Sequence, residues 1–195
     1  MSAAMQAVWY EANGNAAEVL THGEMPVPVP AAGELLVRLA ASGVNPSDVK
    51  ARAGSRPMGF DRVIPHSDGA GVVTAVGEGV SSSRVGERVF VYQAQYGRQL
   101  GTAAEYVALD SVRAPTLPEN ASFEVGACVG IPIMTAHRCV FADGPVADQL
   151  ILVTGGAGRV GHYATQWAHR AGARVIATAS NEEDAKACRE AGAEA

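Results

Sequence analysis

A glycine-rich loop restricts the fold of this 195-residue chain more than any other feature of its sequence. The loop spans residues 155–161, follows an apolar run at 150–153 and precedes a predicted helix at about 160–171 that Gly172 ends. A second strand is predicted over 174–179, and residues 180–183 have the capping-box spacing that begins a further helix. The alternation of strand and helix predicts the first half of a doubly wound parallel sheet.

Within the loop, Gly156, Gly158 and Gly161 satisfy the pattern G-x-G-x-x-G. The first glycine is expected to allow a tight turn, the second to admit a diphosphate close to the backbone, and the third to let helix and strand pack closely. A plain structural turn is the alternative, but the strand before the loop and the helix after it favour a Rossmann-type dinucleotide site. The predicted cofactor-binding residues of the loop are Gly156, Ala157, Gly158, Arg159, Val160 and Gly161.

The end of the second strand bears on the choice between NAD and NADP. An acid is expected there to bind the ribose 2′-OH of NAD, but the chain has Ala179 and Ser180. The missing carboxylate favours NADP(H). Residues 182–184 are acidic and would repel a 2′-phosphate if they pointed inward, whereas Lys186 or Arg159 would supply compensating charge.

The first part of the chain has a different pattern. Short strands separated by glycine-rich turns predict a compact, partly open β-barrel. Asn45 and Pro46 begin a helix that Gly54 ends, and Ser122 caps a helix expected to run toward Val140. We therefore predict two domains, residues 1–118 and residues 119–195. The predicted strands of the first domain are residues 7–10, 34–41, 71–76, 88–92 and 104–109.

Composition excludes several classes of partner. A net charge of −5 gives no electrostatic reason to expect a nucleic acid or an anionic membrane surface. The longest apolar run, residues 125–136, is too short to span a membrane, and residues 1–5 lack the features of a signal peptide. We expect a cytoplasmic protein.

Four stretches of the sequence resemble one family. They are Gly-Val-Asn-Pro-Ser-Asp at 43–48, Ser-Asp-Gly-Ala-Gly-Val at 67–72, Gly-Ile-Pro-Ile-Met-Thr-Ala at 130–136 and the segment from Ile151 through the glycine loop. In this order they resemble the zinc-free quinone oxidoreductases, the zeta-crystallin type, of the medium-chain dehydrogenase/reductase superfamily. The resemblance implies a GroES-like β-barrel domain followed by a Rossmann-type domain.

The same resemblance implies an activity and a set of site residues. It implies an NADPH-dependent enzyme that transfers hydride to a quinone or an α,β-unsaturated carbonyl compound. Asn45 and Thr135 would border the nicotinamide, Lys50 stands where relatives often carry a tyrosine, and Ser180 would lie near the 2′-phosphate. A structural role is the alternative for two of them: Asn45 as a helix cap, and Thr135 as a hydroxyl bonded to its own helix.

Metal binding is not expected. A catalytic zinc needs three protein ligands, chiefly Cys and His. In zinc-dependent relatives a Cys stands at the place of Asn45 and a His-Glu pair at the place of Ser67 and Asp68, while His66 is one position away. Two alternatives to a zinc-free reductase remain: a non-catalytic, crystallin-like NADPH-binding protein, and a zinc-dependent alcohol dehydrogenase.

The chain supplies only one half of the expected nucleotide-binding sheet. A complete dinucleotide site needs both mononucleotide halves. We therefore expect the chain to continue past Ala195, or a partner to cover the open edge of the sheet, which leaves open whether the 195 residues alone are active. We expect the full-length form to be a homodimer.

Overall fold

The computed structural model describes residues 3–195, which form two compact units. The first unit ends at Ile131, and the second runs from Pro132 to Ala195. This division comes later than the predicted domain boundary at 118, because Phe123 and Ala127 pack with Ala70 and so belong to the first unit. The expectation of no signal peptide concerns residues 1–5, of which the first two lie outside the described part.

The first unit contains short strands, as predicted, and those of its two sheets pair antiparallel. Its larger sheet has the order β5-β4-β3-β6, and a second sheet pairs β1 with β2. Leu35, Val37 and Leu39 lie on one face of the predicted strand 34–41; in the structure Leu35 and Val37 are completely buried in the main core and Leu39 packs against it. The strands are β1 (Ala4–Trp9), β2 (Thr21–Pro26), β3 (Glu34–Gly43), β4 (Asp68–Val76), β5 (Arg88–Val91) and β6 (Tyr106–Asp110).

Short helical turns connect these strands. The helix predicted after Asn45 begins at Pro46, as expected, and leads into a single π-helical turn that contains Gly54 at φ 99°. Only a residue that tolerates positive φ fits there, which explains the predicted stop. The helical elements of the first unit are α1 (Ala16–Val19), α2 (Pro46–Lys50), the π-turn Ala51–Ser55, the 3₁₀ turns Ser82–Arg84 and Ser111–Arg113, and α3 (Phe123–Gly126).

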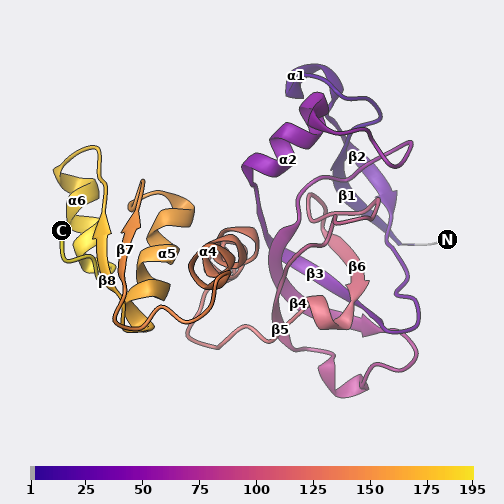
Figure 1. Cartoon of the computed structure of the whole chain (residues 1–195). Coiled ribbons are helices and arrows are strands. Elements are labelled where there is room, and N and C mark those ends of the chain that lie inside the picture. The colour runs from indigo at the N-terminus through magenta and orange to yellow at the C-terminus, as the bar shows by residue number, and fades with distance from the viewer. Residues whose placement is uncertain (1–2) are drawn as a thin grey trace. The chain divides into compact units, whose positions relative to one another are not determined.

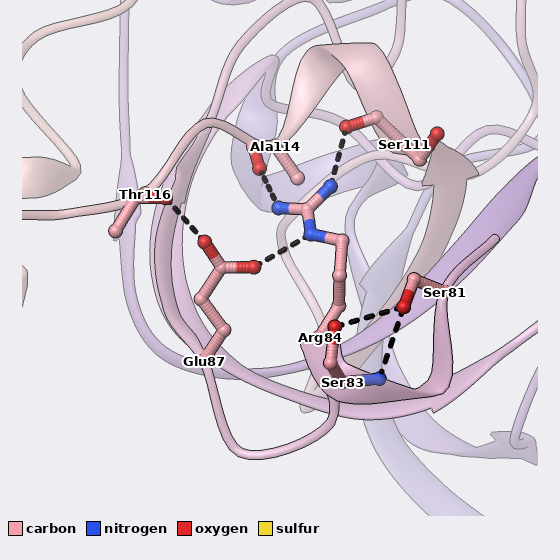
Figure 2. A network of polar contacts seen from close by, with 7 residues as sticks. All are labelled: Ser81, Ser83, Arg84, Glu87, Ser111, Ala114 and Thr116. Carbon is pink, nitrogen blue, oxygen red and sulfur yellow. Dashed lines mark hydrogen bonds and ion pairs between the residues drawn. The ribbon is translucent and has the colours of Figure 1, made fainter.

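Arg84 joins the turn that precedes β5 to the segment that follows β6 by hydrogen bonds (Figure 2). Its guanidinium donates to the carbonyl oxygens of Ser111 (3.0 Å) and Ala114 (2.6 Å) and to the carboxylate of Glu87 (2.6 Å). The other carboxylate oxygen of Glu87 accepts from the Thr116 hydroxyl. The planar, five-donor guanidinium satisfies carbonyl groups that no strand pairs.

The second unit contains the predicted alternation of strand and helix. Figure 1 shows β7 and β8 side by side, and they are parallel, with Ile151 opposite Val175. Apolar residues of all three helices pack with Val153 and Val175 in one core. The elements are α4 (Ile131–Phe141), β7 (Leu150–Val153), α5 (Arg159–Arg170), β8 (Arg174–Ala177) and α6 (Glu182–Glu190). No helix within residues 3–195 is long and apolar enough to cross a membrane.

The single helix predicted from Ser122 toward Val140 is wrong. The segment forms two helices, α3 and α4, with a break over residues 127–130. Pro132 has no N–H with which to continue a preceding turn. A Cβ atom at Gly130 would lie 2.1 Å from the Asp68 carboxylate, so the chain presses against β4 at this point. The main-chain N–H of Ile131 then donates to Asp68.

A continuous apolar run such as residues 150–153 predicts a strand buried on both faces of a parallel sheet, and this prediction is also wrong for this chain. Leu150 and Leu152 are 61% and 64% exposed, whereas the alternate residues, Ile151 and Val153, join the core. Successive side chains of a strand point to opposite faces. The helices of the second unit therefore cover one face of the β7–β8 pair and leave the other exposed.

Candidate cofactor-binding site

The glycine loop leads directly from β7 into α5. Gly158 is the N-cap residue of α5 in an extended conformation (φ −72°, ψ 165°), and no side chain among residues 3–195 caps the helix. The first N–H groups of an α-helix have no partner within the helix, and the helix dipole adds partial positive charge there. This arrangement suits an anionic group such as a diphosphate.

The backbone conformation or the close packing of the loop explains why glycine occupies three of its positions. The sequence predicted that Gly156 allows the tight turn. In the structure the residue with positive φ is Gly155 (φ 65°), one position earlier. A Cβ atom at Gly156 would lie 2.7 Å from both the Ala177 Cβ and the Cys188 Sγ. At Gly161 it would lie 2.1 Å from the Gly155 carbonyl oxygen, which agrees with the predicted close packing of the third glycine.

Thr178 holds the loop from the carboxyl end of β8. The N–H of Gly155 donates to the Thr178 hydroxyl (2.8 Å), and the N–H of Gly156 donates to the Thr178 carbonyl (2.9 Å). The N–H of Thr178 in turn donates to the Val153 carbonyl at the end of β7 (2.9 Å). The two parallel strands and the loop are therefore joined at one edge of the sheet, where α/β proteins bind their ligands.

A hollow lies beside this edge. Of the predicted cofactor residues, Ala157, Gly158 and Ser180 line it, whereas Gly156, Arg159, Val160 and Gly161 lie in the loop or on α5 without lining it. Sequence reasoning did not identify Thr178 as part of the site, although a polar residue at the end of a parallel strand was a usable signal. The complete lining is Gly155, Ala157, Gly158, Thr178, Ala179, Ser180 and Asp184.

The three acidic residues after β8 differ in their exposure to solvent. Asn181, not Ser180, is the N-cap of α6, and its side-chain oxygen accepts from the N–H of Asp184 (2.9 Å). This one-residue shift from the predicted capping box sets the register of the helix. Glu182 and Glu183 are exposed, whereas Asp184 is half-buried and lines the hollow.

The residues predicted near the nicotinamide lie in different units. Asn45 and Lys50 flank α2 in the first unit, while Thr135 is on α4 in the second. Asn45 is 5% exposed, and both Lys50 and Thr135 are exposed. The roles of all three in catalysis remain predictions.

Asn45 is part of a buried polar cluster in the first unit. Its main-chain N–H donates to Asp48 (2.8 Å), and its side-chain amide donates to the Asp68 carboxylate (2.8 Å). The same oxygen of Asp68 accepts from the N–H of Ile131 (2.7 Å), while its other oxygen, Oδ1, is buried with no hydrogen-bond partner among the described residues. Burial raises the pKa of Asp68 to about 6. Asp68, on β4, therefore accepts from the N-cap residue of α2 and from the first residue of α4.

His66 adjoins this cluster in an unusual backbone conformation, φ 74°. Its Nδ1 lies 3.0 Å from the Ser42 hydroxyl, which lies 2.9 Å from the hydroxyl of Thr102. Thr102 donates to the Asp68 carbonyl (2.6 Å), so Ser42 donates to Thr102 and His66 Nδ1 donates to Ser42. Burial lowers the pKa of His66. The described residues contain no group of three or more His, Cys, Asp or Glu side chains placed to hold a metal ion.

A second hollow lies wholly within the first unit and was not predicted. Tyr10 contributes a buried aromatic ring, and burial raises the pKa of its hydroxyl. Phe60 and Tyr96 are more exposed, and Arg56 adds a positive charge. The complete lining is Tyr10, Ala51, Arg56, Pro57, Met58, Gly59, Phe60, Val63, Gln95, Tyr96, Gly97 and Arg98.

Comparison with known proteins gives a consistent result. Residues 31–119 match the alcohol dehydrogenase GroES-like domain. The chain is 38% identical to the quinone oxidoreductase of Mus musculus over 166 residues, which is 84% of this chain and 49% of the relative. It is 36% identical to that of Sus scrofa over 164 residues, 82% of this chain and 48% of the relative.

A solved structure of a mycobacterial protein complexed with NADPH is similar over most of the chain. The TM-score is 0.83 at 35% identity, and the match covers 97% of this chain and 56% of the other. The chain thus spans about half the length of the curated relatives that it matches.

Proposed function

The chain belongs to the quinone oxidoreductases of the medium-chain dehydrogenase/reductase superfamily, and we propose that the whole protein is an NADPH-dependent, zinc-free reductase of quinones or α,β-unsaturated carbonyl compounds. One observation carries the proposal: the glycine loop, the uncapped start of α5 and the end of β8 together border a hollow. The NADPH complex of the similar mycobacterial protein supports the choice of cofactor.

The residues of the hollow fit a dinucleotide. Gly155, Ala157 and Gly158 carry small or no side chains, so a diphosphate can approach their backbone. Ser180 offers a hydroxyl in the short segment between β8 and α6, and the resemblance places it near the 2′-phosphate of the adenosine ribose. When bound, the dihydronicotinamide supplies a hydride to the acceptor. The protein's contribution is to bind and orient both partners and to exclude water.

The aromatic hollow of the first unit is our candidate for the acceptor site. Tyr10, Phe60 and Tyr96 line it with aromatic side chains that suit a planar quinone, and Arg56 is a hydrogen-bond donor for a carbonyl oxygen. We expect Arg56→Ala to raise the KM for a quinone about tenfold with little change in KM for NADPH, as expected for loss of one charged hydrogen bond. Arg62→Ala is the control, since Arg62 pairs with Glu11 outside the hollow. An equal effect of the two variants would reject this assignment.

The zinc-free part of the proposal depends on the buried cluster. Zinc-dependent relatives carry a Cys at the place of Asn45 and a His-Glu pair at the places of Ser67 and Asp68, whereas here the Asn45 amide donates to the Asp68 carboxylate. These three positions offer one carboxylate and neither thiolate nor imidazole, which is fewer than the three protein ligands that a catalytic zinc needs. Metal analysis of the purified full-length protein tests this: stoichiometric zinc would favour the alternative of a zinc-dependent alcohol dehydrogenase.

The activity is tested with the full-length protein. NADPH is mixed with 1,4-benzoquinone, 9,10-phenanthrenequinone or an enone, and the absorbance at 340 nm is followed. Turnover is expected, and its absence with every acceptor would refute the reductase. Tight NADPH binding by calorimetry without oxidation would instead support the non-catalytic, crystallin-like alternative. Homodimer assembly and a cytoplasmic location stay predictions, to be checked by light scattering and cell fractionation.

A further inference from the structure

We propose that Asp184 is a selectivity residue of the cofactor hollow, which weakens binding of a 2′-phosphate and so reduces the preference for NADPH over NADH. The inference rests on the proposed function, because it requires a nicotinamide dinucleotide in the hollow. It deepens that function by assigning a residue to the choice between the two cofactors.

The position of Asp184 distinguishes it from its acidic neighbours. Three consecutive acids, residues 182–184, begin α6. Asp184 lines the hollow together with Ser180 and Thr178, whereas Glu182 and Glu183 are exposed and are not part of the lining. The register set by the Asn181 cap therefore brings one acid to the hollow and leaves the other two in solvent.

Two hydrogen bonds with Asn181 hold Asp184 in place. The side-chain amide of Asn181 donates to its Oδ2 (3.0 Å), and the side-chain oxygen of Asn181 accepts from the main-chain N–H of Asp184 (2.9 Å). These two bonds hold the carboxylate beside the end of β8. A carboxylate at this place accepts a hydrogen bond from a ribose 2′-OH but repels a 2′-phosphate.

Positive charge does not offset Asp184 within the hollow. Its lining includes no Lys, Arg or His among residues 3–195, and Asp184 is its one ionisable side chain there. Lys186 lies 3.8 Å from Glu190 on the exposed side of α6, and Arg159 is exposed at the start of α5. The neutral strand end at Ala179 and Ser180 thus favours NADPH, while Asp184 opposes it.

A purely structural role for Asp184 makes a different prediction. Acids in the first turn of a helix interact favourably with its dipole, and Asp184 shares this property with Glu183. If this were its only role, removing the charge at either position would change stability and leave cofactor preference alone. Glu183→Gln is therefore the matched control for Asp184→Asn: each removes one charge from the same turn.

The test measures the dissociation constants of NADPH and NADH by calorimetry with the full-length protein and both variants. Adenosine 2′,5′-bisphosphate and 5′-AMP serve as probes of the adenosine end alone. If the separation were on the order of 6 Å in a water-like dielectric, Coulomb's law would give about a tenfold change in the affinity ratio when one unit charge facing a doubly charged phosphate is removed. We expect Asp184→Asn to shift the preference toward NADPH, and toward the bisphosphate, by about tenfold, and Glu183→Gln to shift it by less than about twofold.

Salt provides a second readout that a structural role would not change. Screening weakens repulsion between partly exposed charges. Raising the ionic strength is therefore expected to increase the NADPH-to-NADH affinity ratio of the unaltered protein more than that of Asp184→Asn. An unchanged ratio in Asp184→Asn, or equal shifts in both variants, overturns the role of Asp184 while leaving the cofactor site intact. Failure of the unaltered protein to bind either dinucleotide refutes the proposed function itself, and this inference with it.

Discussion

Replacing Asp68 by Asn removes a carboxyl group that the first unit holds in its interior. Asp68 is 0% exposed, and burial raises its pKa from 3.8 to about 6. Hydrogen bonds from the Ile131 N–H and the Asn45 amide act in the opposite direction, since both favour the charged form. The folded chain therefore holds the Asp68 proton more tightly than the unfolded chain does.

This difference makes the stability of the protein depend on pH. Below about pH 3.8 the group is protonated in both states, so it contributes no penalty. As the pH rises from 3.8 to about 6, the unfolded state ionises first and folding loses free energy; above about 6 the loss is constant. The shift from 3.8 to about 6 corresponds to roughly 3 kcal/mol, at about 1.36 kcal/mol per pKa unit.

Asparagine isolates this contribution. Its side-chain oxygen retains an acceptor for Asn45 and Ile131, while its NH₂ group takes the place of the unpartnered Oδ1 at a cost of about 1–3 kcal/mol that does not vary with pH. The experiment measures only the part of the difference in unfolding free energy that changes with pH. Urea unfolding of the wild type and Asp68→Asn is followed from pH 4 to pH 8.

As the pH rises from 4 to 8, we expect the wild type to lose about 2–3 kcal/mol of unfolding free energy relative to Asp68→Asn. Asp61→Asn, at an exposed position, is the control for loss of a surface charge. A difference between wild type and Asp68→Asn that stays constant from pH 4 to pH 8 would refute the reasoning.

Three further substitutions test other parts of the structure by urea unfolding. Gly156→Ala places a Cβ 2.7 Å from the Cys188 Sγ and should cost about 1–3 kcal/mol, part of which Cys188→Ala restores; full stability of the single variant would contradict the close packing. His66→Val should be less stable than His66→Asn by about 1–2 kcal/mol, because φ 74° suits Asn and not a β-branched residue; equal midpoints would argue against this conformation. Arg84→Lys should lose about 1–2 kcal/mol, since the three donors of an ammonium share one nitrogen and cannot reproduce the planar spread of Nε, Nη1 and Nη2 shown in Figure 2; an unchanged midpoint would show that the network contributes little.

Most of the strands, the glycine loop and the helix after it were predictable because their signals are local, whereas β2 was not among the predicted strands. Alternation at Leu35 and Val37 reports the buried face of β3, and Gly172, at φ 85°, ends α5 as expected. Turn chemistry and periodicity depend on residues that are neighbours in sequence. The family followed from motifs of the same kind, such as the pattern around Gly156.

The break between α3 and α4 was not predictable in this way. Residues 122–140 carry a nearly continuous apolar pattern that favours one helix. The break coincides with the contact between Gly130 and Asp68, a residue that is 63 positions from its hydrogen-bond partner Ile131. No window of local sequence contains both partners, so only the folded chain brings them together.

The candidate site also combines features that local sequence determines with features that depend on contacts between distant segments. The sequence by itself determined that a strand enters the loop at Gly155 and that a helix leaves it, because backbone propensities and the steric freedom of glycine act within a few residues. It also placed three acids after β8. Only the tertiary structure decided that Asp184 lines the hollow while Glu183 faces solvent, because that choice depends on the register of α6 against β8 and on packing between segments that are distant along the chain.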